Sequence, residues 1–241
     1  MLTSSCKKEG DDNTNTNNNN NNPSPITVTD IDGNVYSTIT IGTQVWMAEN
    51  LKTTKYRDGS AIPNVTSDSV WGTLSAGAYC NYNDDATNST TYGRLYNWYA
   101  VNDTRMIAPA GWHVPKDAEW STLVNYLIAN GYNFDGTTTG NSIAKSLAST
   151  TLWSGSANAG AVGNTDYPSY RNKTGFTALP GGDRYVNGSS FSGLGSFGYW
   201  WSSTASAPGV AWSRYMGYSA SGVFRIGYVK EVGLSVRCLR N

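Results

Sequence analysis

The sequence contains a single histidine, His113, in the stretch Gly-Trp-His-Val-Pro. A Ser-His-Asp triad would have to use this imidazole as its base, but the sequence has no Gly-x-Ser-x-Gly nucleophile elbow. A zinc site needs several His or Cys ligands at matched spacing, which this chain does not offer. A phosphate-binding loop and a dinucleotide fingerprint are also missing from the sequence. We therefore interpret His113 as a structural residue beside Trp112 and Pro115.

Acidic residues give only weak patterns for calcium. The stretch Asp-Ile-Asp-Gly-Asn at 30–34 resembles the start of a calcium loop but lacks the later ligands and the terminal glutamate, so we interpret it as a turn. Asp84, Asp85 and Asp183 could ligate calcium together with loop carbonyls, which is a weak pattern. We expect no metal site and no cofactor.

Cys6 follows Leu-Thr-Ser-Ser and precedes Lys-Lys-Glu-Gly-Asp-Asp. This stretch resembles the end of a bacterial lipoprotein signal followed by the acidic export signal of surface lipoproteins in the Bacteroidetes. Only five residues precede Cys6, so the charged and apolar regions of a signal peptide are missing. We expect lipidation of Cys6 and attachment to the outer membrane, with the domain exposed at the cell surface. The alternative is a free cysteine in a flexible tail.

Two further cysteines, Cys80 and Cys238, allow two interpretations. An exported protein meets an oxidising compartment, where they could form a disulfide that closes a loop of nearly the whole domain. They could equally be two buried thiols, because the sequence does not show the separation of their Cα atoms.

The composition excludes one class of partner and indicates the domain organisation. The 241 residues carry a formal net charge of zero, so no basic excess exists to neutralise the phosphates of a nucleic acid. Residues 1–25 are rich in asparagine and lack apolar periodicity, which predicts a disordered tether. We expect a single folded domain over residues 26–241.

The apolar pattern predicts an α+β domain with two helices, short antiparallel sheets and long loops. Alternation on both sides of Gly42-Thr43 predicts a β-hairpin over residues 35–47. Helical spacing predicts a main helix that begins near Asp117 and ends before Gly131, with one apolar stripe: Trp120, Leu123, Val124, Leu127 and Ile128. A shorter helix is predicted within 141–150.

The second half of the chain is rich in Gly, Ser, Asn and Pro. From Thr151 onward this composition predicts short strands that alternate with long loops. The segment Gly-Leu-Ser-Val-Arg-Cys-Leu-Arg-Asn predicts a terminal strand with Leu234, Val236 and Cys238 on one face.

Six segments in this order closely resemble the Fibrobacter succinogenes major paralogous domain: DIDGNVYSTITIGTQVWMAENLKTTKYRDG, YGRLYNWYAV, PAGWHVPKDAEWSTL, GFTALPGGDR, GYWWSST and GLSVRCLRN. The resemblance covers nearly all of residues 28–241. It implies a C-type-lectin-like fold related to the formylglycine-generating and sulfatase-modifying group. Members are typically exported or surface lipoproteins, in agreement with the interpretation of Cys6.

Departures from the related families limit what the resemblance implies. Relatives often carry cysteine where this chain has Ala108, which removes one disulfide partner and leaves Cys80 with Cys238. Formylglycine-generating enzymes use a pair of cysteines near the C-terminus, and here only Cys238 stands there. The calcium and sugar motifs of true C-type lectins are also missing. The resemblance therefore does not imply oxidase activity or calcium-dependent sugar binding.

The aromatic residues divide into a core set and a surface set. We expect Trp112, Trp120, Trp200 and Trp201 to be core. The stretch after Trp201 is expected to form an exposed ligand-binding face, because Tyr provides rigid contact area and Ser adaptable hydrogen bonds. Its candidate residues are Ser206, Val210, Trp212, Ser213, Tyr215, Tyr218 and Phe224. The alternative is an ordinary sheet face with tyrosines in cross-strand pairs.

These observations favour a non-catalytic binding or adhesion module at the cell surface, with an extracellular protein or glycan as ligand. Some members of the resembling family are variable proteins diversified by retroelements in the stretch after the tryptophan pair. A structural subunit of a surface fibre or pilus is the alternative function. An enzyme of the formylglycine-generating type is a weaker third hypothesis.

Overall fold

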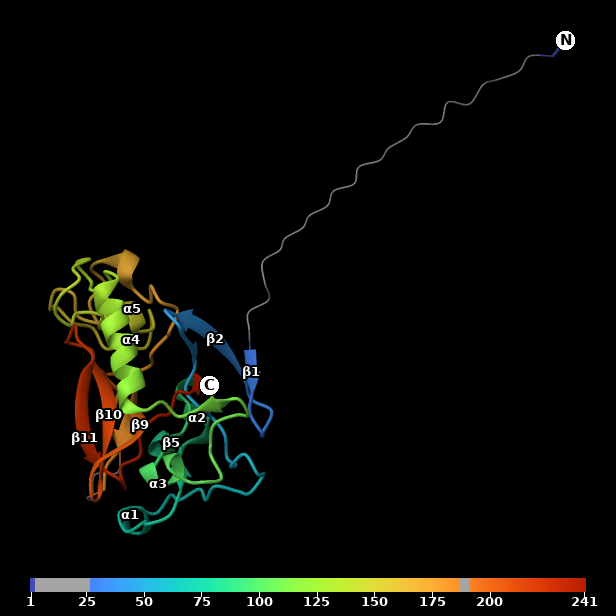
Figure 1. Cartoon of the computed structure of the whole chain (residues 1–241), viewed down its shortest axis with the longest axis vertical. Helices are drawn as coiled ribbons and strands as arrows, with labels where there is room; N and C mark the ends of the chain where they lie inside the picture. Colours follow the sequence, from blue (N-terminus) through green and yellow to red (C-terminus); the bar gives the residue numbers. More distant parts are fainter. Residues whose placement is uncertain (3–26, 187–190) are drawn as a thin grey trace.

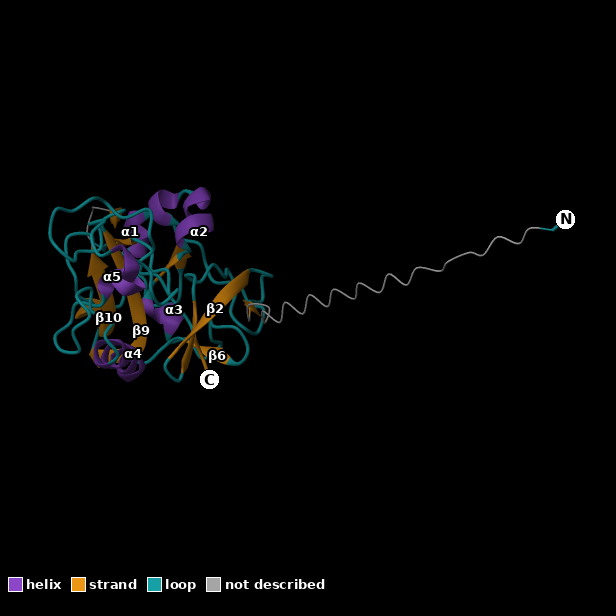
Figure 2. Ribbon diagram, turned by 90° about the horizontal axis from the view of Figure 1, so that it is seen from above, coloured by secondary structure: helices purple, strands orange, loops and turns teal. Residues whose placement is uncertain are grey.

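A computed structural model describes residues 1–2, 27–186 and 191–241, so Cys6 and most of the predicted tether lie outside the described residues. The described part contains two five-stranded sheets, a two-stranded sheet and mostly short helices (Figures 1 and 2). Few helices and mainly antiparallel sheets define an α+β fold, which confirms the fold class predicted from the sequence.

The first sheet joins the two ends of the domain. Its strand order is β1-β2-β3-β12-β6, with bounds Thr27–Thr29, Val35–Ile41, Gln44–Met47, Leu239–Arg240 and Trp112–His113. β2 and β3 form the predicted hairpin, and Gly42 adopts a φ of 61° in the turn between them, a conformation that glycine tolerates. In the middle of the sheet, Leu239 pairs with Trp46 of β3 and with His113 of β6.

The second sheet has the order β11-β10-β9-β7-β8, with bounds Phe224–Val229, Val210–Gly217, Phe197–Ala207, Gly181–Arg184 and Phe191–Leu194. The prediction of only short strands after Thr151 is wrong here, since β9 has 11 residues and β10 has 8. No proline interrupts β9, and the chain turns only at Pro208-Gly209, where Gly209 has a φ of 76°. Register shifts on both sides of Ala211 locally interrupt the pairing of β9 with β10.

The main helix, α4 (Asp117–Ala129), confirms the predicted stripe. Trp120, Leu123 and Leu127 are buried along it. The predicted second helix is shorter than expected: α5 (Ala144–Leu147) has four residues. The backbone becomes extended at Ala148, which forms a bridge to Ala178 instead of continuing the helix. The other elements are α1 (Asp68–Trp71), α2 (Ala86–Tyr92), α3 (Trp98–Val101), β4 (Tyr79–Cys80), β5 (Leu95–Tyr96) and the 3-10 turns Tyr82–Asp84 and Pro168–Tyr170.

The tryptophan pair of β9 joins the two main parts of the core. Trp200 packs between the second sheet and α4, where its ring centroid lies 6.5 Å from that of Trp120. Trp201 points the opposite way, into the cluster that contains Trp112, and donates its indole N–H to the carbonyl of Tyr96 at 2.9 Å. All four tryptophans expected in the core are no more than 5% exposed, which confirms that prediction.

Residues 232–239 form a buried connection, and the terminal strand is shorter than predicted. Only Leu239–Arg240 is a strand, while Leu234 bridges to Tyr96 and Ser235 bridges to Trp200. Because the segment contacts different sheets in succession, it cannot maintain one continuous ladder. Both of its faces are buried, and even Arg237 is fully enclosed.

Candidate functional site

Strand register divides the seven predicted ligand-binding residues between the two faces of the second sheet. Tyr215 pairs with Tyr199 of β9 and with Phe224 of β11, so these three side chains share one face. Trp212 lies an odd number of residues from Tyr215 on the same strand and pairs with Gly227. Its side chain therefore projects from the opposite face.

The face that carries Tyr215 presents a continuous series of rings, which we call the aromatic ladder: Phe197, Tyr199, Tyr215, Phe224 and Tyr228. Ring centroids along it are 5.9 Å apart for Phe197 and Tyr199, 5.8 Å for Tyr199 and Tyr215, and 5.1 Å for Tyr215 and Phe224. Tyr228 meets Tyr199 edge-on at 5.7 Å. Phe224 is 39% exposed, and the other four rings are partly exposed. The ladder thus offers a row of contacting aromatic surfaces to solvent.

A buried carboxylate stands at one end of this ladder. Asp183 of β7 follows Gly182, which pairs with Gly198 of β9, so alternation places Asp183 on the same face as Tyr199. Asp183 is 4% exposed and accepts a hydrogen bond from the Ser192 hydroxyl at 2.6 Å. Burial raises the pKa of this carboxyl, and the hydrogen bond from Ser192 only partly opposes the shift.

Tyr199 contributes a protonated hydroxyl beside this carboxylate. Burial raises the pKa of Tyr199, and the neighbouring Tyr228 and Asp183 add to the shift. The ladder therefore combines apolar ring faces with hydroxyl groups and one enclosed acid, the mixture typical of a ligand-binding surface.

The remaining predicted residues lie elsewhere. On the α4 side of the sheet, the Arg225 guanidinium lies 3.3 Å from the centroid of the Trp212 ring, and Val210 and Ser206 are close to Gly227 on that same side. Ser213 is fully buried and donates its hydroxyl to the carbonyl of Ile226 at 3.0 Å, so it is not part of the exposed surface.

Tyr218 follows the end of β10 and is partly exposed. The fold thus brings Tyr215 and Phe224 together on one face of the sheet and Ser206, Val210 and Trp212 together on the other. The predicted ligand-binding set did not include Phe197, Tyr199 and Tyr228, and Asp183 was considered only as a weak calcium candidate. The alternation of Phe197 and Tyr199 immediately before the tryptophan pair was a usable signal.

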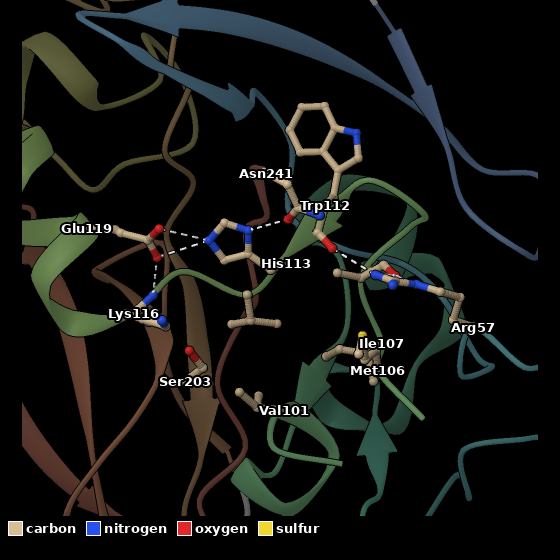
Figure 3. Close-up of a pocket in the computed structure, with 12 residues that line it drawn as sticks. Arg57, Val101, Met106, Ile107, Trp112, His113, Lys116, Glu119, Ser203 and Asn241 are labelled. Atoms are coloured by element: carbon tan, nitrogen blue, oxygen red, sulfur yellow. Dashed lines mark hydrogen bonds and ion pairs between the residues drawn. The ribbon is translucent and has the colours of Figure 1, made fainter. Parts of the chain in front are cut away.

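A second candidate site is the cleft around His113, shown in Figure 3. It encloses about 530 Å³ between β6, α3, β9 and the 106–108 loop. His113 contacts Glu119 through Nε2 at 3.0 Å and the side-chain oxygen of Asn241 through Nδ1 at 2.7 Å. Glu119 also accepts the backbone N–H of Lys116 at 2.7 Å, closing the first turn of α4.

The His113 arrangement is a positioning network. Both ring nitrogens already have partners, so the imidazole is not placed to take a proton from Ser203, which also lines the cleft. This geometry agrees with the structural interpretation of His113.

The described residues contain no cluster of three or more His, Cys, Asp or Glu side chains suited to hold a metal ion. Asp84 lies 3.7 Å from Arg184, and Asp183 bonds Ser192. Cys80 and Cys238 are both free buried thiols in different core clusters, which is the second of the two interpretations of this pair. No helix within the described ranges has the length and apolar character to cross a membrane.

Fold and site together define an α+β domain with an aromatic sheet face and a separate apolar cleft. The chain belongs to the Fibrobacter succinogenes major domain family (Fib_succ_major), whose family model matches residues 39–240. This membership confirms the resemblance found in the sequence motifs. No curated protein and no solved structure matches the chain.

Proposed function

We propose that this protein is a non-catalytic binding or adhesion module that takes an extracellular protein or glycan ligand on the aromatic ladder. The observation that carries the proposal is the contiguity of five partly exposed rings across three strands, with Asp183 at their edge. Tyrosine at such a surface supplies large contact area with little rotamer freedom to lose. An enclosed carboxylate adds a hydrogen-bond acceptor that selects for hydroxyl or amide groups.

The placement of the strands supports display of this surface. In Figure 1, β1 lies on the opposite side of the domain from β10 and β11, and in Figure 2 β10 lies on the side of the domain away from β2. A domain held through the segment that leads into β1 would therefore present its second sheet away from the attachment point. We propose lipidation of Cys6 in the outer membrane as that attachment, with multiple acyl chains for stable anchoring. Replacement by Cys6→Ser, expressed behind a complete signal peptide, is expected to release the protein from the membrane fraction.

The binding proposal is tested by screening the domain on glycan and protein arrays and comparing two variants. Tyr215→Ala with Phe224→Ala removes the exposed end of the ladder, while Trp212→Ala removes an aromatic ring from the opposite face. We expect the first variant to lose the ligand with little change in unfolding midpoint, and the second to keep it. Equal loss of binding in both variants, or loss only through unfolding of the first, contradicts the proposal.

The finer family-based features belong to the same proposal. A C-type-lectin-like topology and retroelement diversification of the ladder strands are expected, and sequencing the 200–230 region in a clonal population tests the second. The alternative function, a fibre subunit, is supported by the position of β11 at the edge of the second sheet, where its free backbone groups could pair with a strand of another molecule. Ordered polymers in electron micrographs of the purified protein would favour assembly, and oxidation of a cysteine peptide would favour an enzyme instead.

A further inference from the structure

The cleft around His113 has the size of a small-molecule site and is separate from the aromatic ladder. Its volume of about 530 Å³ lies within the range of roughly 300–1,000 Å³ found for ligand pockets. The walls are mainly aliphatic and thioether side chains: Val101, Met106, Ile107, Ala108 and Val114. Four of these residues are buried, while Met106 is 49% exposed at the mouth of the cleft.

Hydrogen bonds from Arg57 to backbone carbonyls hold the rim of the cleft in place. The guanidinium of Arg57 donates to the carbonyls of Ala108, Pro109 and Trp112 at 2.8 to 3.1 Å. Met106 adopts a φ of 60°, unusual for a residue other than glycine, and its carbonyl accepts the backbone N–H of Arg57 at 2.8 Å. A preformed rim reduces the conformational cost of binding.

Two cationic side chains stand at the edge of this apolar space. Arg57 and Lys116 flank the cleft on two sides (Figure 3). Among the described residues, neither side chain has a carboxylate within ion-pair distance. Glu119, the acidic side chain that lines the cleft, is engaged by His113 and by the backbone N–H of Lys116. A cation without a carboxylate partner favours an anionic ligand.

We propose that the cleft binds a small monocarboxylate with an apolar body. The apolar part lies against Val101, Ile107 and Val114, and the carboxylate lies at the rim next to the Lys116 ammonium. Arg57 keeps its hydrogen bonds to the three carbonyls and acts only through its charge. Lys116 is therefore the residue that distinguishes an anionic ligand from a neutral or cationic one. Neither Tyr215 nor Phe224 lines this space, so the cleft can be tested independently of the ladder.

Three probes of equal chain length test the proposal by isothermal titration calorimetry on the full chain: octanoate, octanamide and octylamine. We expect octanoate to bind most tightly and octylamine most weakly. Lys116→Gln is expected to weaken octanoate binding about two- to five-fold, the effect of a solvent-exposed ion pair, and to leave octanamide unchanged. Lys173→Gln, which removes an exposed lysine stacked on Tyr170 away from the cleft, is the matched control.

A blocking variant locates the binding in the cleft. Ser203 lines the space and is only partly buried, and its backbone N–H donates to the carbonyl of Pro115 at 2.9 Å. Ser203→Phe should therefore fill the cleft and abolish octanoate binding, with circular dichroism used to check that the fold is retained. The proposal is overturned if octanoate does not bind, if octanamide or octylamine binds as tightly, or if a folded Ser203→Phe protein binds octanoate normally.

Discussion

Asp117, the first residue of α4, holds two arginines of the second sheet and offers a sharp test of how helix and sheet are joined. Its carboxylate lies 2.5 Å from Nη1 of Arg214 and 2.9 Å from Nη2 of Arg225. The Arg214 side chain is only 4% exposed, whereas that of Arg225 is 44% exposed. Asp117→Asn keeps the shape of the side chain and removes the charge that balances a buried cation.

The expected loss of stability follows from these exposures. Removing one partner of a buried ion pair costs about 3–5 kcal/mol, because the other charge stays enclosed. Arg214 keeps a hydrogen bond to Ser121 Oγ at 3.0 Å, so we expect the lower end, about 3 kcal/mol, or a fall in melting temperature of roughly 6–12 °C. Arg225→Gln is the matched control and should cost about 1 kcal/mol or less, since its charge is solvated.

Urea unfolding followed by circular dichroism measures both variants across acid pH. Burial alone would raise the pKa of Asp117, but the hydrogen bonds from Arg225 and Arg214 outweigh it and hold the pKa below 3.8. The carboxylate therefore stabilises the fold fully above about pH 5 and loses this effect as the pH falls through its lowered pKa. The stabilities of the native protein and Asp117→Asn should converge in acid. Equal unfolding midpoints near about pH 7, or a gap that does not change with pH, would refute the reasoning.

Three further outcomes are expected. Trp120→Ala should lower the unfolding free energy by about 3–5 kcal/mol in urea titrations, because this ring contacts other core rings and is 2% exposed. Arg237→Lys should cost about 2 kcal/mol or more by the same measurement, since the planar guanidinium stacks 4.3 Å from the Phe176 ring centroid and donates to Asn50. In a Cys6→Ser background, a thiol reagent at mildly alkaline pH should label neither Cys80 nor Cys238 until the protein is unfolded, because burial raises the pKa of Cys80 to about 12 and also raises that of Cys238. If the two cysteines stay unlabelled even after the protein is unfolded without a reducing agent, they form a disulfide instead.

The sequence predicted the elements whose information is local. The 3.6-residue spacing from Trp120 to Leu127 specifies the buried stripe of α4, and Gly42 marks the first hairpin turn. The face of the sheet on which each β10 residue lies was harder to predict. Trp212 and Tyr215 were assigned to one surface because they are close in sequence. Strand alternation separates them, and pairing with β9 and β11 decides their neighbours.

The cleft could not be predicted, because its lining depends on tertiary contacts between distant segments. Arg57, Val101, His113, Ser203 and Asn241 reach it from separate parts of the chain. Each of these residues lies in a different sequence motif, and no motif by itself indicates that they meet. The same reason explains why the conformation of residues 232–239 was not predicted. These residues pack against several sheets and are buried on both faces, so their sequence does not show the polar and apolar alternation of a half-exposed strand.

The central position of β12 in the first sheet sets the order in which the domain can be completed during synthesis. β3 pairs with β2 on one edge, but its other edge and β6 are joined only through Leu239–Arg240, so both stay open until these residues have been synthesised. Closing such a long loop is slow, and the open strand edges are exposed to aggregation meanwhile. The first sheet therefore stays incomplete until residues 239–240 have left the ribosome, however early its β2–β3 hairpin forms.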